Sequence, residues 1–172
     1  MFSRVAAAVG FLFVCAIAAA VPASAADAAK PDYVVLVRRA EVNRSAEQVW
    51  KLVGADYCSI SVWFKMTCSY RTGSGDVGTE RVLNGSTVEA MVAKTPYSYT
   101  YWQTEGNMAT TSYHGTLAVE ARGADKSEIV YTLFYDQAGL ASDAQREAER
   151  QRLMTRFQGA VDTMKSLAES QR

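Results

Sequence analysis

The sequence has little of the chemistry on which most enzyme classes rely. Its 172 residues include one histidine, His114, and three cysteines. They contain no G-x-S-x-G, P-loop, H-E-x-x-H or dinucleotide-binding motif. A lone histidine without a neighbouring Cys, Asp or Glu motif is a weak signal for a metal site or a catalytic triad. We therefore expect neither a metal ion nor a cofactor.

An excess of charge of either sign is also absent, since 18 Lys and Arg residues balance 18 Asp and Glu residues. Nucleic acids and acidic lipid surfaces select proteins with clustered basic residues, so neither is expected as a partner. No proline-rich linker, repeat or low-complexity tract interrupts residues 26–172. The sequence predicts a single domain over that range, long enough to bury a sizeable core.

An uncharged apolar run occupies residues 5–21, directly after Arg4, and the small-residue pattern A-S-A follows it. This combination predicts a signal peptide over residues 1–25, cleaved near Ala25/Ala26. The protein is then periplasmic or secreted and has no stable membrane anchor. The alternative is a membrane-spanning anchor, because the run approaches the roughly 20 apolar residues that a span needs.

Removal of the signal peptide takes Cys15 and leaves two cysteines, Cys58 and Cys68. A pair of thiols in an exported domain favours a disulfide, and closing so short a loop stabilises a fold by about 2–3 kcal/mol. The alternative, a redox or metal pair, lacks a C-x-x-C spacing and a neighbouring histidine. Trp63 and Phe64 lie between the cysteines, where they can serve as a lid or fill the core.

Local patterns predict a strand at residues 33–42, then a helix that Ser45 caps and Gly54 ends, then a short helical turn at residues 58–63. Six more strands are predicted at residues 66–71, 79–83, 86–94, 97–103, 111–120 and 128–135. The Asn-Gly pair between the second and third of these is typical of a tight hairpin.

The last helix is predicted from Ser142 to about Glu169, and its charged beginning is expected to be solvated. Its apolar stripe consists of Leu153, Phe157, Val161, Met164 and Leu167. An antiparallel sheet without crossover helices must curl and have one face covered. We therefore expect an α+β fold, in which a curved antiparallel sheet of about seven strands wraps on a long C-terminal helix. Two short helices follow the first strand, and a ligand cavity lies between sheet and helix.

Several patterns match one family: Ser45-Ala46-Glu47-Gln48-Val49-Trp50, Cys58…Trp63…Cys68, Gly75-x-x-Gly78-x-x-Arg81, Glu89, Tyr99 with Tyr101, and Tyr113. With the order of the elements, they make the chain resemble the START-like superfamily, also called SRPBCC or Bet v 1-like, which has the helix-grip fold. Within it, the chain is similar to exported bacterial proteins of the polyketide cyclase/dehydrase-like branch. Related exported members often have His-Pro after Trp63, whereas this chain has Phe64-Lys65, so its lid is more apolar.

The resemblance implies that polar side chains on the strands point into the cavity, which makes Glu89, Arg81 and Tyr113 the catalytic candidates. Arg81 could clamp a carboxylate, and Glu89 could fix the guanidinium or accept a proton. Alternatively, Arg81 and Glu89 form a cross-strand pair that faces solvent. Apolar residues occupy both faces of the strand at 86–94, so alternation does not decide between the two.

Aromatic side chains supply most of the expected ligand contacts. Tyr97, Tyr99 and Tyr101 alternate along one strand and form a row that either stacks on a flat ligand or packs in the core. Relatives often have a Trp in the last strand, near the position of Tyr131. The candidate ligand-binding residues are Trp63, Phe64, Arg81, Glu89, Tyr99, Tyr101, Tyr113, Tyr131, Phe157, Val161 and Met164.

Three functions are compatible with these patterns. The first is a periplasmic protein, monomeric or weakly dimeric, that binds a small hydrophobic or aromatic molecule. The second is a cofactorless cyclase, lyase or dehydratase acting on an aromatic or polyketide-like substrate, which requires Glu89 inside the cavity. The third is an accessory protein that docks on a periplasmic oxidoreductase partner, which requires Trp63 and Phe64 to be exposed.

Overall fold

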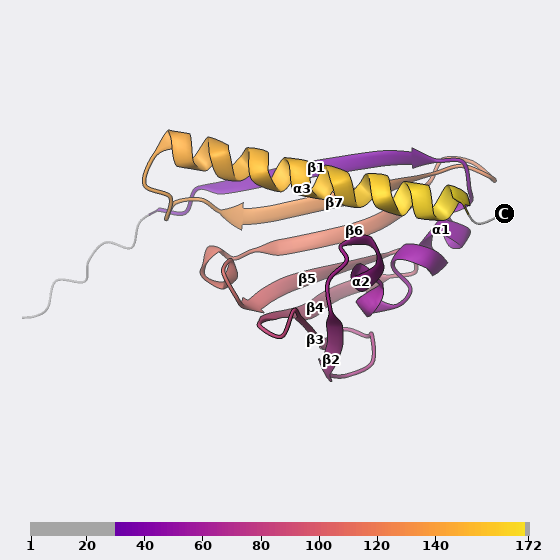
Figure 1. Ribbon diagram of the computed structural model, residues 1–172, viewed down its shortest axis with the longest axis horizontal. Helices are drawn as coiled ribbons and strands as arrows, with labels where there is room; N and C mark the ends of the chain where they lie inside the picture. Colours follow the sequence, from indigo (N-terminus) through magenta and orange to yellow (C-terminus); the bar gives the residue numbers. More distant parts are fainter. Residues whose placement is uncertain (1–29, 171–172) are drawn as a thin grey trace, which may run out of the picture.

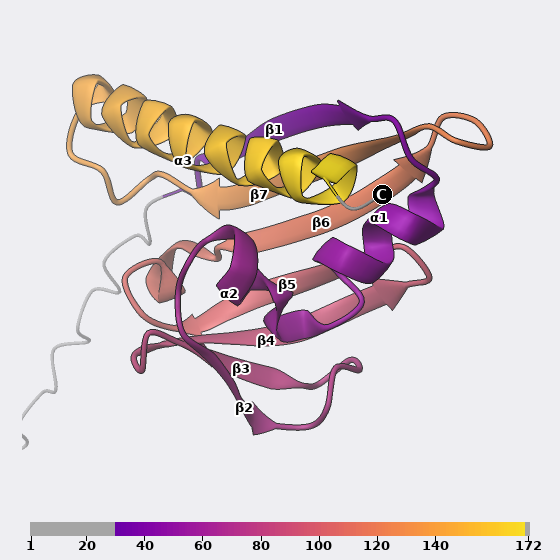
Figure 2. The same cartoon turned by 45° about the vertical axis from the view of Figure 1, so that its right-hand side comes forward.

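A curved antiparallel sheet wrapped around one long helix is the frame of the structure (Figures 1 and 2). The structure is a computed structural model and describes residues 30–170. The expected signal peptide, its cleavage point and Cys15 lie outside these residues. Within them, the sheet has seven strands in the order β1-β7-β6-β5-β4-β3-β2. The expected α+β helix-grip fold is confirmed.

The first and last strands of the chain are neighbours in this sheet. The strands are β1 Tyr33–Val42, β2 Cys68–Thr72, β3 Glu80–Leu83, β4 Thr87–Thr95, β5 Ser98–Glu105, β6 His114–Ala121 and β7 Ser127–Asp136. The helices are α1 Ala46–Val53, α2 Ile60–Trp63 and α3 Asp143–Ser170, with 3-10 turns at Tyr57–Ser59 and Ala109–Thr111. Tyr33 pairs with Asp136 and Val42 with Ser127, so β1 forms one edge of the sheet beside β7.

Most strand boundaries lie within two residues of the prediction, and in two strands a turn replaces the predicted beginning. The strand predicted at 111–120 begins three residues later, since residues 109–111 form a 3-10 turn and Ser112 has a left-handed φ of 52°. The strand predicted at 97–103 begins at Ser98, because Tyr97 belongs to the β4–β5 turn. Asn84 and Gly85 have φ values of 49° and 72°, as a tight hairpin turn requires.

Helix α1 begins and ends where the sequence predicts. The Ser45 hydroxyl accepts a hydrogen bond from the Gln48 amide, and the Gly54 amide donates to the Trp50 carbonyl at 2.9 Å. Gly54 has φ −140°, so the left-handed freedom of glycine is not used here. A Cβ at this position would lie 2.3 Å from the Trp50 ring. Glycine is therefore required because the indole occupies the space of a side chain.

Helix α3 lies across β1 and β7, on the concave side of the sheet (Figure 1). Its buried face consists of Leu153, Phe157, Ala160, Val161, Met164 and Ala168. Ala168 takes the last position of the stripe, where Leu167 was expected, and Leu167 is only half-buried. No helix of residues 30–170 is both long and apolar enough to cross a bilayer. Helix α1 packs on β6 and β7, and its Trp50 ring meets the Tyr99 ring of β5 at 5.8 Å, whereas the short helix α2 contacts α3 (Figure 2).

The predicted disulfide joins Cys58, in the 3-10 turn before α2, to Cys68, the first residue of β2, with their Cα atoms 5.5 Å apart. Asp56 supports the same region, since its carboxylate accepts from the Cys58 amide at 2.8 Å and from the Tyr70 hydroxyl at 2.6 Å. The short helical segment is thereby fixed to the edge strand of the sheet.

Reduction of this disulfide should lower the free energy of unfolding by about 2–3 kcal/mol, because the unfolded chain regains the freedom of the closed loop. Urea unfolding with and without reductant measures the difference, and a Cys58→Ser/Cys68→Ser double variant, insensitive to reductant, is the control. Titration of residues 26–172 under denaturing conditions should detect no free thiol before reduction. Two free thiols would contradict the disulfide.

Candidate functional site

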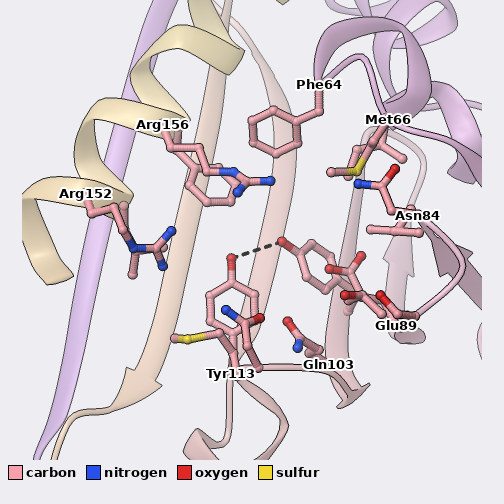
Figure 3. Close-up of a pocket in the computed structure, with 17 residues that line it drawn as sticks. Phe64, Met66, Asn84, Glu89, Gln103, Tyr113, Arg152 and Arg156 are labelled. Atoms are coloured by element: carbon pink, nitrogen blue, oxygen red, sulfur yellow. Dashed lines mark hydrogen bonds between the residues drawn. The ribbon is translucent and has the colours of Figure 1, made fainter. Parts of the chain in front are cut away.

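A cavity of about 230 Å³ lies between α2, α3 and the strands that α3 leaves uncovered (Figure 3). Its apolar wall includes Ile60, Phe64, Met66, Leu83, Leu153 and Phe157. Its polar wall includes Asn84, Glu89, Gln103, Tyr113, Arg152 and Arg156. Both the sheet and the helix contribute to each wall, as a helix-grip cavity requires.

Arg81 and Glu89 form a buried ion pair at the base of this cavity. They are register partners on β3 and β4, and their side chains are 0% and 6% exposed. Nε and Nη2 of Arg81 donate to the same Glu89 oxygen at 2.8 and 2.6 Å. The two residues therefore form a cross-strand pair, as one alternative expected, but the pair is buried and does not face solvent.

Each guanidinium nitrogen of Arg81 donates a hydrogen bond to a protein oxygen. Its Nη1 donates to the Tyr57 carbonyl, and its guanidinium carbon lies 3.9 Å from the centre of the Tyr57 ring. Arg81 does not line the cavity, whereas Glu89 does. The guanidinium therefore positions Glu89 and is not free to clamp a substrate carboxylate.

The environment of Glu89 shifts its ionisation to higher pH. Burial raises the pKa of Glu89, and the Arg81 guanidinium opposes this shift without cancelling it. The second carboxyl oxygen, Oε1, has no hydrogen-bond partner among residues 30–170. Glu89 is therefore a candidate acid or base whose free oxygen lies at the cavity wall.

Three tyrosine hydroxyls form a chain that leads from the core to the cavity. The Tyr101 hydroxyl lies 3.0 Å from that of Tyr131 and 3.4 Å from that of Tyr113. The Tyr101 ring crosses its register partner Gly115, where a Cβ would lie 2.3 Å from the ring. Burial raises the pKa of Tyr113, so its hydroxyl keeps its proton at neutral pH.

Helix α3 contributes two arginines that flank the apolar stripe. Arg152 and Arg156 are one turn apart and line the cavity beside Leu153 and Phe157. Arg152 donates two hydrogen bonds to Glu149 at 2.7 and 2.6 Å. Its place at the cavity corrects the expectation that the charged beginning of this helix is only solvated.

The structure distributes the expected ligand-binding residues between the cavity wall and the core. Phe64, Glu89, Tyr101, Tyr113 and Phe157 line the cavity. Trp63, Arg81, Tyr99, Tyr131, Val161 and Met164 are buried behind it. The expected row of three tyrosines is reduced to Tyr99 and Tyr101, because Tyr97 is 39% exposed in a turn.

The expected lid consists of Phe64 without Trp63. The Trp63 indole is 3% exposed, and its Nε1 donates to the Val53 carbonyl at 3.1 Å. Phe64 is half-buried and meets the Phe157 ring edge-on at 5.1 Å. Trp63 therefore fills the core beneath the short helix, and the pair does not form an exposed edge.

His114 lies apart from the cavity. Its ring stacks on that of Trp102 at 6.2 Å, and its Nδ1 lies 2.7 Å from the Ser112 carbonyl oxygen. In the part of the chain that the structure describes, no three His, Cys, Asp or Glu side chains are grouped as metal ligands. His114 therefore has no part in the candidate site.

Sequence reasoning missed the polar residues Asn84, Gln103, Arg152 and Arg156, together with Met66 and Met108. The signal for the arginines was present, because each directly precedes a residue of the predicted apolar stripe of α3. Asn84 was interpreted only as a turn residue. Gln103 ends a predicted strand, and nothing in its pattern indicates a cavity.

The profile of the family described as "Polyketide cyclase / dehydrase and lipid transport" matches residues 34–169. No curated protein matches the chain. Among solved structures, norcoclaurine synthase from Thalictrum flavum, in complex with dopamine and hydroxybenzaldehyde, is similar with a TM-score of 0.65. Its sequence identity is 15%, over 83% of this chain and 90% of that chain.

Two bacterial structures are also similar. A protein from Thermobifida fusca has a TM-score of 0.59 and 24% identity, over 74% of this chain and 84% of that chain. A protein from Nitrosospira multiformis has a TM-score of 0.60 and 20% identity, over 81% of this chain and all of that chain (100%). These likenesses show a shared fold, and they agree with the START-like architecture described above.

Replacing Arg81 by Met should lower the free energy of unfolding by about 3–5 kcal/mol, because it leaves Glu89 buried without its partner. Arg71→Met is the matched control, since Arg71 is half-exposed and exposed pairs contribute about 0–1 kcal/mol. Urea unfolding of both variants measures the difference. The double variant Arg81→Met/Glu89→Leu should recover much of the loss, and equal costs for Arg81→Met and Arg71→Met would contradict the buried pair.

Proposed function

We propose that this chain, which belongs to the polyketide cyclase/dehydrase and lipid-transport family, binds a small hydrophobic or aromatic molecule. The cavity between the sheet, α2 and α3 is the observation that carries this proposal. Its volume of about 230 Å³ is close to the lower end of the range of ligand pockets, about 300–1,000 Å³. A compact aromatic or other apolar ligand suits this space.

The composition of the wall supports an aromatic ligand. Phe64 and Phe157 meet edge-on at 5.1 Å and present ring surface to the cavity, where Met66 adds an adaptable thioether. The norcoclaurine synthase structure, which has the same fold, holds dopamine and hydroxybenzaldehyde, two aromatic molecules. This neighbour supports the choice of an aromatic ligand for this chain.

The compartment that we propose is the periplasm or the cell exterior, reached through cleavage of residues 1–25. The disulfide between Cys58 and Cys68 supports it, because such bonds persist in oxidising compartments. We propose a monomer or weak dimer. A docking function at the Trp63-Phe64 edge is not proposed, because it requires both rings to be exposed and Trp63 is buried.

The second candidate function is that of a cofactorless cyclase, lyase or dehydratase. The observation that favours it is the Glu89 carboxyl, which is buried at the cavity wall with a raised pKa. Such a group can exchange a proton with a bound substrate near neutral pH more readily than a free glutamate. Arg81 would then position the carboxyl, and Tyr113 would donate to a substrate oxygen.

Blocking the opening of the cavity should lower the affinity for a ligand. Asn107 is exposed at its rim, so Asn107→Trp places an indole in the opening at little cost to folding. The affinity for N-phenyl-1-naphthylamine, measured by fluorescence, should fall at least about tenfold, the equivalent of 1.4 kcal/mol. Asp125→Trp, in the exposed β6–β7 turn, is the matched control and should leave the affinity unchanged. Unaltered binding by Asn107→Trp would show that the dye binds elsewhere.

Titration of the glutamates separates an acid-base role for Glu89 from a purely structural one. The pKa of Glu89 should lie above the usual glutamate value of about 4.3, because burial raises it. Glu128 should ionise below it, because hydrogen bonds from Arg122 lower its pKa. Carbon-13 NMR of the carboxyl groups measures both, with Glu89→Gln to assign the resonance. A pKa of Glu89 at or below that of Glu128 would exclude the acid-base role.

A further inference from the structure

The cationic end of the cavity contains an arginine with no acidic partner. Arg156 makes no ion pair and no side-chain hydrogen bond with any residue from 30 to 170, whereas Arg152 is bound to Glu149. The Arg156 guanidinium is held over the Phe64 ring, 4.9 Å from its centre. This contact fixes the cation at the cavity wall while its N–H groups stay available.

Counting protons along the tyrosine chain shows that one hydroxyl proton is left for the cavity. Three hydroxyls carry three protons, and the two contacts centred on Tyr101 use two of them. A spare proton on Tyr131 would be buried without an acceptor, because Tyr131 is 0% exposed and its hydroxyl has no further partner among the described residues. A buried unpaired donor costs about 1–3 kcal/mol. Tyr131 is therefore the donor to Tyr101, and the remaining proton belongs to Tyr101 or Tyr113, both of which line the cavity. When Tyr101 donates to Tyr113, the chain runs from Tyr131 to Tyr113, and the third proton points into the cavity.

The direction of this chain also strengthens the final donor. Each hydroxyl that accepts a hydrogen bond becomes a better donor in turn, and the low dielectric of the core increases the effect. Tyr113 is thus a polarised donor rather than an ordinary phenol. Figure 3 shows its hydroxyl and the Arg156 guanidinium projecting into the same part of the cavity.

The opposite wall adds a further donor and no free negative charge. Asn84 Oδ1 accepts from the Thr67 amide at 3.0 Å, so its Nδ2 is the group left for the cavity, as Figure 3 shows. Glu89 is the only acidic residue among those that line the cavity, and Arg81 already neutralises it. The cavity wall as a whole is therefore positive and rich in donors.

We propose that the ligand carries a carboxylate, bound between the Arg156 guanidinium and the Tyr113 hydroxyl, with its apolar body against Phe64 and Phe157. This inference rests on the binding function proposed above and narrows it to aromatic or other apolar acids. A planar guanidinium and a phenol donor can each bind one carboxylate oxygen. A neutral ligand of the same shape would make no charge-assisted hydrogen bond with Arg156, which is exposed at the cavity wall.

The test uses a matched pair of ligands, 1-naphthoate and 1-naphthamide, which differ in charge but hardly in shape. Isothermal titration at low salt should show that the protein binds the acid about tenfold more tightly than the amide, as charge-assisted hydrogen bonds predict. Arg156→Gln should remove most of this preference, because it lowers the affinity for the acid and leaves that for the amide unchanged. Tyr113→Phe should lower the affinity for the acid more than the affinity for the amide. Added salt should narrow the difference in the wild type.

Lys51→Gln is the control, because it removes one positive charge from α1, away from the cavity lining, and should leave the preference intact. Equal affinities for acid and amide, unchanged in Arg156→Gln, would overturn the inference while the binding function stands. Displacement of N-phenyl-1-naphthylamine by the amide but not by the acid would also overturn the inference and leave the binding function standing. Failure of the dye and of both naphthalenes to bind would refute the binding function and the inference together.

Discussion

The buried pair of Arg81 and Glu89 is the interaction on which the site depends. An ionisable carboxyl can remain in the core only with a charged or hydrogen-bonded partner, and Arg81 supplies that partner across β3 and β4. The guanidinium needs a third contact, which the Tyr57 carbonyl provides. Tyr57 opens the 3-10 turn that contains Cys58, and the bond to Cys68 fixes that turn to β2 beside β3. The disulfide and the ion pair thus belong to one connected support for the cavity wall.

A second constraint comes from the uneven cover of the sheet. Helix α3 fills the concave side over β1 and β7, and the short helices cover the rest incompletely, which leaves the cavity. Gly115 then matters because its missing side chain lets the Tyr101 ring cross β6 and join Tyr131 to Tyr113. A polar chain inside an apolar core is stable only when each member is satisfied. Its last member, Tyr113, faces the cavity, so the acceptor for its hydroxyl proton has to come from the ligand.

Local signals with a single physical cause could be predicted from the sequence, whereas those that depend on packing could not. The Ser45 cap and the Asn84-Gly85 turn lie where the sequence places them, because each follows from backbone chemistry within a few residues. The orientation of Glu89 did not follow from alternation, because β4 shifts register between Val88 and Glu89 and again after Met91. Val88 and Glu89 are consequently both buried. A bulge is visible only when the partner strand is known. The positions of Arg152 and Arg156 at the cavity could not be predicted, because helical periodicity identifies the apolar stripe of α3 but not which flank of the stripe borders a cavity.

Binding and acid-base chemistry meet in the charge of Glu89. Burial raises the pKa of Glu89, so the protonated form persists to higher pH than in a free glutamate. In that form the charge of Arg81, which lies behind the cavity wall, is no longer balanced, and the potential in the cavity becomes more positive. An anionic ligand is then attracted more strongly, and by linkage its binding promotes protonation of Glu89. As the pH rises through the raised pKa, the carboxylate forms and this attraction weakens. Protonation of Glu89 therefore favours the binding of acids and is required for acid catalysis, and in catalysis the proton leaves Glu89 for the ligand.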